Sequence, residues 1–424
     1  MLNKFLQAFK IPEIRNKIFI IAGLLAAFRF MAAIPLPGID RARLLELFSS
    51  NQLLGFLNIF SGGALDNLSI MMLGVGPYIT STIVMQLLTM IFPQLKAMYY
   101  EEGAIGRAKF NRYSLYLTVP LAALQSYGLL NLLNQQGVFL NFTLFNIITS
   151  VVIATAGSMI LVWLGNIITR QKLGNGVSLI IFSGIVSGIP QTIRQAILSY
   201  DPSVITTYLA FVILSVIIVA GVVFMTEGER KIPVSYAKRV RGNKMYGGVS
   251  SYLPLKVNQA GVIPIIFAIS ILLFPQFLAQ ISAIISKDFS VKFNDWVVYF
   301  LNNQIIYGVA YFALVVLFTY FYTSIIFDPK EISKNLQQAG GFIPGIRPGQ
   351  STGEFLLKII NRITLFGAFF LGFIAVLPNI TQILTGINRL TIGGAALLIV
   401  VSVALETMKQ IDSQLVVREY DGNF

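Results

Sequence analysis

The chain contains no cysteine and no histidine, and each absence removes a class of chemistry. Without cysteine there is no disulfide framework and no thiol chemistry. Without histidine the chain lacks the commonest general base and the commonest metal ligand. Both absences weaken large enzyme classes.

Charged residues are also scarce, at 12% of the chain, whereas hydrophobic residues make up 55% and the mean hydropathy is +0.75. A soluble domain carries about 25% charged residues. This composition indicates a polytopic membrane protein. The net charge of +13 could indicate a nucleic-acid binder. A membrane protein needs cations in its inner loops, however, and we favour that explanation.

Apolar stretches near the length needed to cross a bilayer of about 30 Å recur along the chain. With the N-terminus inside, the inner segments hold 24 Lys and Arg residues and the outer segments hold 6, while Arg29 lies within the first stretch. Inner loops are normally the cationic ones, so we expect both termini to be cytoplasmic. The predicted spans are residues 18–34, 70–92, 113–133, 144–168, 177–197, 204–226, 259–283, 304–327, 359–381 and 391–411.

Ten spans divide into two sets of five, and we predict an N-terminal half, residues 1–200, and a C-terminal half, residues 201–424. Two related halves with an odd number of spans would sit inverted in the membrane. In each half a long loop separates the first span from the second, at residues 35–69 and 227–258. The later loops do not match, and no clear residue repeat accompanies them.

The second predicted span is broken where a helix ought to be continuous. The segment Asn58–Gln86 begins as a Gly-rich stretch and then becomes an apolar run interrupted by Gly74, Gly76 and Pro77. A broken backbone is tolerated at membrane depth only beside protein or a water-filled cavity. We therefore infer that this segment lines a path through the membrane.

Polar residues at membrane depth are few and uncharged. Gln86 lies in the second span and Asn258 opens the seventh. Both suit a hydrogen-bonded seam between helices, in which such a bond is worth about 0.6–2 kcal/mol and is weak enough to open.

Two loops have features beyond what topology requires. Residues 227–258 carry seven cations with interleaved tyrosines, which predicts an exposed hairpin that docks a large anionic partner. An ordinary solvated loop over anionic lipid is the alternative. In residues 328–358, glycines and prolines fix the backbone around Arg347, which is typical of a recognition feature, the alternative being a helix-ending turn.

Long motifs in one order along nearly the whole chain resemble the SecY family, the central subunits of the bacterial protein-translocation channel. The resemblance implies an all-α polytopic membrane protein with ten transmembrane helices in two inverted five-helix halves around a central pore. It also implies a bacterial cytoplasmic (inner) membrane location and transport of unfolded secretory proteins, with lateral insertion of membrane proteins. The motifs are IPLPGID, FSGGALDNLSI, GVGPYITSTIVMQLL, GNGVSLIIFSGIV, IPVSYAKR, LPLKVNQAGVIPIIFA, FDPKEISKNLQQAGGFIPGIRPG and RITLFGA.

The resemblance implies roles for particular residues. Residues 56–70 correspond to the plug, a helix that fills the outer funnel of the idle channel, and Gln86 and Asn258 fall in the lateral gate, which opens to lipid. The plug residues are Phe60, Ser61, Gly62, Gly63, Ala64, Leu65 and Asp66. The residues at the family's pore-ring positions are Val75, Ile79, Ile181, Ile266 and Ile399.

The resemblance also implies partners. These are SecE-like and SecG-like small membrane subunits, the ribosome, the motor ATPase SecA, signal sequences, nascent chains and membrane lipid. SecA would supply the ATP hydrolysis, because the chain shows no nucleotide site. We therefore expect a transport channel that is not itself an enzyme and that holds no cofactor and no metal. The residues expected to dock the ribosome or the motor are Lys238, Arg239, Arg241, Lys244 and Arg347.

Two other functions were weighed against a translocation channel. A secondary transporter of small solutes is compatible with inverted halves and a discontinuous helix, but it predicts an ionisable or densely polar site at the midplane, and the sequence offers essentially none. An intramembrane hydrolase needs a nucleophile and a base, and no such constellation is found.

Overall fold

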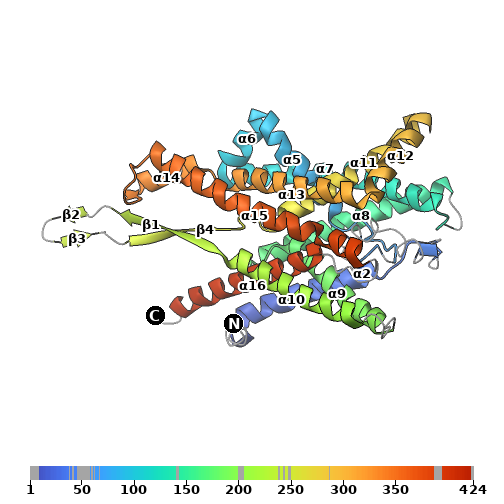
Figure 1. Ribbon diagram of the computed structural model, residues 1–424, viewed down its shortest axis with the longest axis horizontal. Coiled ribbons are helices and arrows are strands. Elements are labelled where there is room, and N and C mark those ends of the chain that lie inside the picture. Colours follow the sequence, from blue (N-terminus) through green and yellow to red (C-terminus); the bar gives the residue numbers. More distant parts are fainter. Residues whose placement is uncertain are drawn as a thin grey trace. The chain divides into compact units, whose positions relative to one another are not determined.

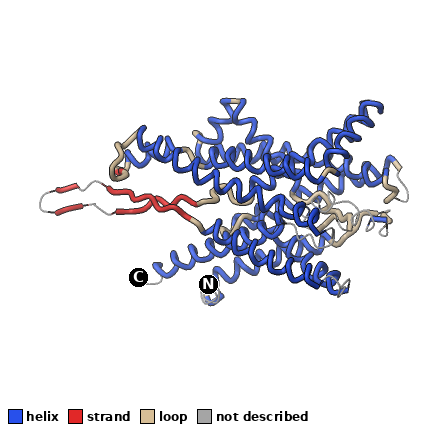
Figure 2. Tube along the Cα trace, in the orientation of Figure 1, coloured by secondary structure: helices blue, strands red, loops and turns tan. Residues whose placement is uncertain are grey.

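The fold is predominantly helical, with two small antiparallel sheets (Figures 1 and 2). The chain divides into two compact units: unit 1 comprises Met1–Pro202, Ile269–Gln304 and Ile399–Phe424, and unit 2 comprises Ser203–Ala268 and Ile305–Leu398. The computed structural model describes residues 9–37, 39–40, 43–44, 58, 61, 63–65, 67–139, 143–198, 205–236, 239–241, 244–246, 250–285, 287–385 and 394–421.

The first break between the units falls close to the predicted boundary at residue 200, and two later segments of the C-terminal half cluster with unit 1. The inverted relation of two five-helix halves stays a prediction.

Unit 1 is a bundle of helices in which α5, α7, α8 and α9 pack in sequence and α2 contacts α8 and α9. Its helices are α2 (Pro12–Ala32), α5 (Gly76–Ile91), α6 (Pro93–Tyr100), α7 (Gly103–Gln135), α8 (Leu144–Arg170), α9 (Gly176–Leu198), α12 (Lys287–Asn302) and most of α16 (Gly394–Asp421).

Unit 2 combines long helices with the strands. Helix α11 (Ile263–Ile285) starts in this unit and continues into unit 1. The other helices are α10 (Ile205–Glu227), α13 (Gln304–Ile326), α14 (Pro329–Gln338) and α15 (Gln350–Thr385). The strands are β1 (Glu229–Tyr236), β2 (Arg239–Arg241), β3 (Lys244–Tyr246), β4 (Ser250–Lys256) and β5 (Gly341–Phe342).

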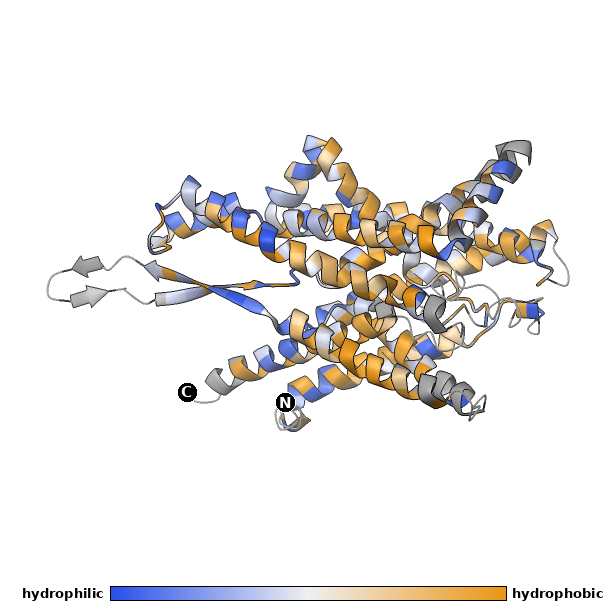
Figure 3. Ribbon diagram, in the orientation of Figure 1, coloured by the Kyte–Doolittle hydropathy of each residue, from blue (hydrophilic) through white to orange (hydrophobic). Residues whose placement is uncertain are grey.

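A described helix overlaps each of the ten predicted spans, and most of the helices are strongly apolar (Figure 3). Within the described residues, three helical stretches are long and apolar enough to cross a membrane: Leu144–Arg170, Gln304–Gln338 and Gln350–Thr381. The bent pair α5 and α6 would make a fourth if it is one span. The structure therefore supports a helical membrane protein, and ten crossings stay a prediction.

The predicted break in the second span is confirmed. Helix α5 begins only at Gly76, with Pro77 in its first turn, and residues 70–75 form turns. Gly74 adopts φ +58°, a left-handed conformation that favours glycine. At its other end α5 meets α6 at 112°, across a break at Phe92. The second span is therefore a short helix bounded by two sharp changes of direction.

Helices in unit 1 approach closely at glycines. A Cβ added at Gly157 of α8 would overlap the carbonyl oxygen of Ile70, in the turns before α5. A Cβ added at Gly176, the first residue of α9, would overlap the carbonyl oxygen of Gly165 on α8. Small residues commonly allow such backbone contacts between membrane helices. The absence of a side chain at Gly157 therefore lets α8 pack directly against the turns that precede α5.

The G157A variant is expected to be destabilised, because the added methyl group must push α8 away from Ile70. Overpacking of this kind typically costs about 1–3 kcal/mol. Gly23 on α2 provides a control, since nothing lies within 4 Å of its Cβ position. Thermal unfolding in detergent should show a lower midpoint for G157A than for G23A, and equal midpoints would contradict the assigned contact.

Aromatic contacts and one close glycine contact join the helices of unit 2. Phe267 on α11 contacts Phe318 and Tyr322 on α13, edge to face, with ring centroids 5.9 Å apart in both pairs. Phe312 of α13 makes a similar contact with Phe369 of α15 at 5.6 Å. Gly372 of α15 also faces the Phe312 ring, which lies 2.8 Å from its Cβ position. These contacts fix α13 against its two neighbours.

Candidate functional site

The segment that precedes α5 is held at its C-terminal end by backbone pairing. The Leu36 N–H donates to the Leu68 carbonyl at 2.9 Å, and the Ile70 N–H donates to the Ile34 carbonyl at 3.0 Å. Leu68 adopts φ +42°, which is uncommon for a residue other than glycine. The chain leaving α2 thus forms a short antiparallel pair with the chain entering α5.

The predicted plug residues are partly described, since Phe60, Gly62 and Asp66 lie outside the described residues. The Ser61 hydroxyl donates to the Asn58 carbonyl at 2.9 Å and accepts from the Leu65 N–H at 3.0 Å. The Gly63 N–H also donates to the Asn58 carbonyl at 2.9 Å. These three hydrogen bonds therefore join the described residues Asn58, Ser61, Gly63 and Leu65 to one another.

Gly63 lies among groups from two other helices of unit 1. It adopts φ +79°, and its Cβ position is 3.4 Å from the guanidinium of Arg29 on α2 and 3.8 Å from the Gly184 carbonyl on α9. A larger side chain there would be strained by the backbone conformation and would crowd the guanidinium. Arg29, the cation within the first predicted span, therefore lies beside the predicted plug.

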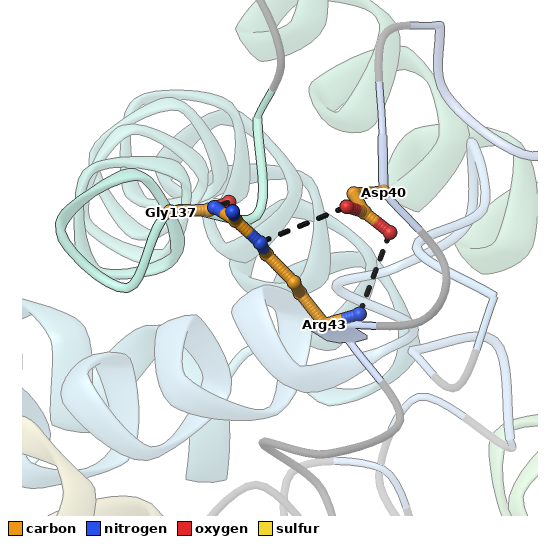
Figure 4. A network of polar contacts seen from close by, with 3 residues as sticks. All are labelled: Asp40, Arg43 and Gly137. Atoms are coloured by element: carbon orange, nitrogen blue, oxygen red, sulfur yellow. Dashed lines mark hydrogen bonds and ion pairs between the residues drawn. The ribbon is translucent and has the colours of Figure 1, made fainter.

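Hydrogen bonds join the loop after α2 to the residues that follow α7, and an ion pair lies within that loop (Figure 4). The Arg43 Nη1 donates to the Gly137 carbonyl at 2.9 Å, while its Nε lies 3.7 Å from the Asp40 Oδ2. The Asp40 N–H donates to the Val138 carbonyl at 2.9 Å. The sequence identifies Arg43 only as a loop cation, because Gly137 is 94 residues away in the chain.

A hydrophobic cluster lies beneath these polar contacts. It joins the loop after α2 and the turns before α5 to α7 and α8, and all its members are buried. Such contacts give the segment before α5 a packed base. The members are Leu36, Leu44, Leu65, Leu68, Met72, Leu129, Leu130, Leu133, Val138 and Ala154.

The polar side chains of α5 are mostly satisfied within helices. Ser81 is fully buried and its hydroxyl donates to the Ser114 carbonyl of α7. The Gln125 Nε2 of α7 donates to the Thr80 Oγ1 at 3.5 Å, and the Thr82 hydroxyl bonds to the Tyr78 carbonyl at 2.9 Å. Ser81 thus joins α5 to α7.

The five residues at the predicted ring positions are all buried, with at most 8% of each exposed. Val75 is the residue immediately before α5, and Ile79 lies one turn into that helix. Ile181 is on α9, Ile399 on α16, and Ile266 in the first turn of α11. Ile266 belongs to unit 2 and the others to unit 1, so their closure into one ring stays a prediction.

The two predicted gate residues are buried and only partly hydrogen-bonded. Gln86 is 9% exposed, and its Oε1 has no hydrogen-bond partner in the described part of the chain. Asn258 is also 9% exposed, and it donates through Nδ2 to the Gly261 carbonyl at 3.1 Å. Its Oδ1 likewise lacks a partner among the described residues. Buried amide oxygens usually have partners, so these two groups retain bonding capacity.

The predicted hairpin in residues 227–258 is confirmed. Strand β1 pairs antiparallel with β4, from Glu229 opposite Lys256 to Ser235 opposite Ser250. Strands β2 and β3 form a second pair, with Arg241 opposite Lys244. The side chains of Arg239, Arg241 and Lys244, and all of Lys238, lie outside the described part.

The second predicted docking loop joins the first through β5. Ser235 and Tyr236 of β1 pair with Phe342 and Gly341, so residues 328–358 extend the hairpin into a three-stranded sheet. A buried cluster supports this sheet against the start of α15. It comprises Ile232, Leu255, Ile343, Leu356, Ile359 and Ile360.

Arg347 is exposed and its backbone is fixed on both sides. Its carbonyl accepts from the Thr352 hydroxyl at 2.9 Å, and the Gly349 carbonyl accepts from the Ser333 hydroxyl of α14 at 2.5 Å. Gly345 and Gly349 both adopt positive φ angles, +82° and +100°. This confirms the predicted rigid loop around one cation.

Together these features define a class: a polytopic helical membrane protein organised around a discontinuous helix, with strands that join two basic loops. In the described residues no group of three or more acidic side chains is placed to hold a metal ion. The SecY family model matches residues 69–408, and the chain belongs to the SecY family.

Relatives by sequence extend over the full chain. It is 43% identical over 445 residues to the protein translocase subunit SecY of Corynebacterium glutamicum, with 99% of each chain covered. It is 40% identical over 443 residues to the subunit of the same name from Mycobacterium bovis, covering 100% of this chain and 99% of the other.

Solved structures share the fold. One is a protein-conducting channel, with a TM-score of 0.65, 18% identity, and coverage of 94% of this chain and 92% of that one. Another, from work on the SecY plug domain, has a TM-score of 0.65 at 19% identity with the same coverage. Sec61 in the canine ribosome–channel complex has a TM-score of 0.62 at 18% identity, again covering 94% and 92%.

Proposed function

We propose that this chain is a protein-conducting channel that carries unfolded secretory proteins across a membrane and releases membrane segments sideways into lipid. The observation that supports this most is its alignment, at about 40% identity and over nearly its whole length, with protein translocase subunits. The broken second span supports it independently, because irregular backbone at membrane depth needs protein or a water-filled cavity beside it.

In this proposal Val75, Ile79, Ile181, Ile266 and Ile399 surround the narrowest part of the path. Aliphatic side chains form a constriction that excludes water, so an ion would lose its hydration on entering. The same side chains make no directional bonds, so they can deform around chains of any sequence. This suits a channel with many different substrates.

The segment around residues 58–70 would act as the plug. Its base is fixed by backbone pairing at residues 34–36 and by the hydrophobic cluster, which includes Leu65, whereas at its tip Ser61 and Gly63 donate hydrogen bonds to the Asn58 carbonyl. These two hydrogen bonds are local, so the tip can be displaced without breaking the backbone pairing that holds the base. We infer that the tip moves when a chain enters and that the base stays in place.

Gln86 and Asn258 would lie on the two sides of the lateral gate. Each has a buried amide oxygen that no described group satisfies. A hydrogen bond between membrane helices averages about 0.6 kcal/mol, so a seam that depends on such bonds opens readily. A hydrophobic signal sequence entering the seam would replace these contacts with apolar ones.

The sheet formed by β1, β4 and β5, with the loop around Arg347, would be the docking surface for the ribosome and for the SecA motor. The pairing of β5 with β1 supports this proposal, because it joins both basic loops to one scaffold. SecA would provide the energy by hydrolysing ATP, and SecE-like and SecG-like subunits would complete the channel. Because cation-rich loops normally face the cytoplasm, both termini and this sheet would lie on the cytoplasmic side of a bacterial inner membrane.

Reconstitution tests the function directly. The full chain with its small membrane subunits, in vesicles supplied with SecA and ATP, should protect a radiolabelled secretory precursor from external protease. Vesicles that lack this chain are the control. Protection that is equal with and without the chain would contradict the proposal, and saturable uptake of a small solute instead would favour the transporter alternative.

A further inference from the structure

We propose that α12 is a membrane-interface helix whose aromatic stripe inserts into the headgroup boundary of the bilayer. The helix connects two apolar helices, since α11 ends at Ile285, α12 begins at Lys287 and ends at Asn302, and α13 begins at Gln304. Neither α11 nor α13 contains a charged residue. Single-residue links join α12 to both helices, so the crossings of α11 and α13 that belong to the proposed function would hold both of its ends beside the same membrane surface.

One face of α12 carries stacked aromatic rings. The Trp296 ring lies nearly parallel to the Phe293 ring, at 11° and 6.1 Å between centroids, and to the Phe300 ring, at 17° and 5.9 Å. Residues at these spacings share a helix face. The stack presents Trp296 with 56% of its surface exposed, and Tyr299 beside it is 65% exposed.

Lys292 and Asp295 lie one turn before Trp296 and Tyr299, so charged residues border the aromatic stripe, and the helix mixes hydrophilic and hydrophobic residues along its length (Figure 3). Asp295 and Lys292 are exposed, and Val297 is the one buried residue among those of α12 whose exposure is described. The described residues therefore leave Trp296 and Tyr299 exposed, whereas the two phenylalanines of the stripe are half-buried. An amphipathic helix with such a stripe is typical of the membrane interface, where tryptophan and tyrosine are enriched.

The net charge of α12 indicates that burial of apolar surface, and not attraction to anionic lipid, would drive its insertion. The helix has two lysines, Lys287 and Lys292, and two aspartates, Asp288 and Asp295, so its net side-chain charge is zero. Polybasic segments bind anionic lipid through charge, and their binding falls with salt. Insertion of α12 should instead be independent of both anionic lipid and salt.

The chain offers a direct fluorescence test, because it has only two tryptophans, Trp163 and Trp296. In the W163F variant, reconstituted in phosphatidylcholine vesicles, Trp296 is the single emitter. A helix buried about 5–10 Å into the headgroup boundary should lose about half of its emission to lipids brominated near the headgroup. Lipids brominated near the chain end should quench it less, and 30% phosphatidylserine or added salt should change neither result.

The W296F variant is the matched control, since Trp163 lies on α8, is 63% exposed and belongs to an apolar span. Lipids brominated near the chain end should quench Trp163 more strongly than they quench Trp296. With lipids brominated near the headgroup this difference should be smaller or reversed. Quenching of Trp296 by aqueous iodide without quenching by brominated lipid would overturn the proposal. Protection of Trp296 from both would also overturn it and would indicate a protein partner on the stripe.

Cysteine labelling gives a second test that does not depend on tryptophan, because the chain has no native cysteine. A membrane-impermeant maleimide added on the side of the membrane that α12 faces should modify D295C readily. It should modify W296C about tenfold more slowly, because burial in lipid disfavours the reactive thiolate. Equal rates at the two positions would contradict insertion of the stripe.

Discussion

Replacing Ile79 and Ile266 together with serine is expected to raise the ion leak of the idle channel by about tenfold or more. Both side chains are buried, and each contributes apolar surface to the proposed constriction. A hydroxyl group lets water enter, which lowers the cost of moving a hydrated ion past that level. A barrier lowered by only about 1.4 kcal/mol would raise the rate tenfold. Conductance of planar bilayers that contain the purified complex measures the effect.

Ile83 provides the control for this experiment. It lies one turn beyond Ile79 on α5 and is 3% exposed, so the I83S variant removes a comparable buried side chain outside the proposed ring. We expect I83S to lower stability without raising conductance. The ring has been assigned incorrectly if the double variant at Ile79 and Ile266 conducts ions no faster than the parent channel. An equal increase in conductance in the I83S variant would lead to the same conclusion.

Reversing the charge of Arg347 should reduce SecA-driven export by at least about tenfold, since an arginine at the centre of an interface commonly contributes 2 kcal/mol or more. The arginine is exposed, and its loop is held by Thr352 and by the contact between Ser333 and Gly349. Transport is measured as protease-protected precursor in vesicles. The R347E variant should still insert into the membrane, because its fold depends on other residues.

Lys334 on α14 is a matched control for Arg347, since it is also exposed and lies on the helix that supports the same loop. The K334E variant makes the same change in net charge. If transport depends on a specific contact of Arg347, K334E should retain most of its activity. Equal losses in R347E and K334E would indicate a general electrostatic effect and would remove the docking role.

Local sequence signals predicted the parts of the fold that depend on neighbouring residues. Apolar runs predicted where helices lie, and the glycines and proline at 74–77 predicted the break that precedes α5, which begins at Gly76. Cations interleaved with tyrosines predicted an exposed hairpin, and β1 and β4 form it. In each case the residues that specify the structure are close together in the chain.

Features that depend on distant residues were not predicted. Strand β5 has only two residues, and its pairing with β1 joins segments about 100 residues apart. The contact of Arg43 with Gly137 and the overlap that excludes a side chain at Gly157 are also long-range. Helix α12 lies between two predicted spans, because its mixed residues lack the long apolar run that indicates a span. The small residues of α8, such as Gly157 and Gly165, are the sequence signal that could have indicated close packing on that helix.

Photocrosslinking of a stalled secretory chain tests directly whether a translocating polypeptide passes along the broken second span. A photoreactive residue is placed at Ile79 on α5 or at Ile266 on α11, and at Trp163 on α8 as a lipid-facing control. We predict that a chain stalled in mid-translocation crosslinks strongly to both Ile79 and Ile266 and only weakly to Trp163. Absence of crosslinks at Ile79 and Ile266, or equal crosslinking at Trp163, would contradict a path along the broken second span.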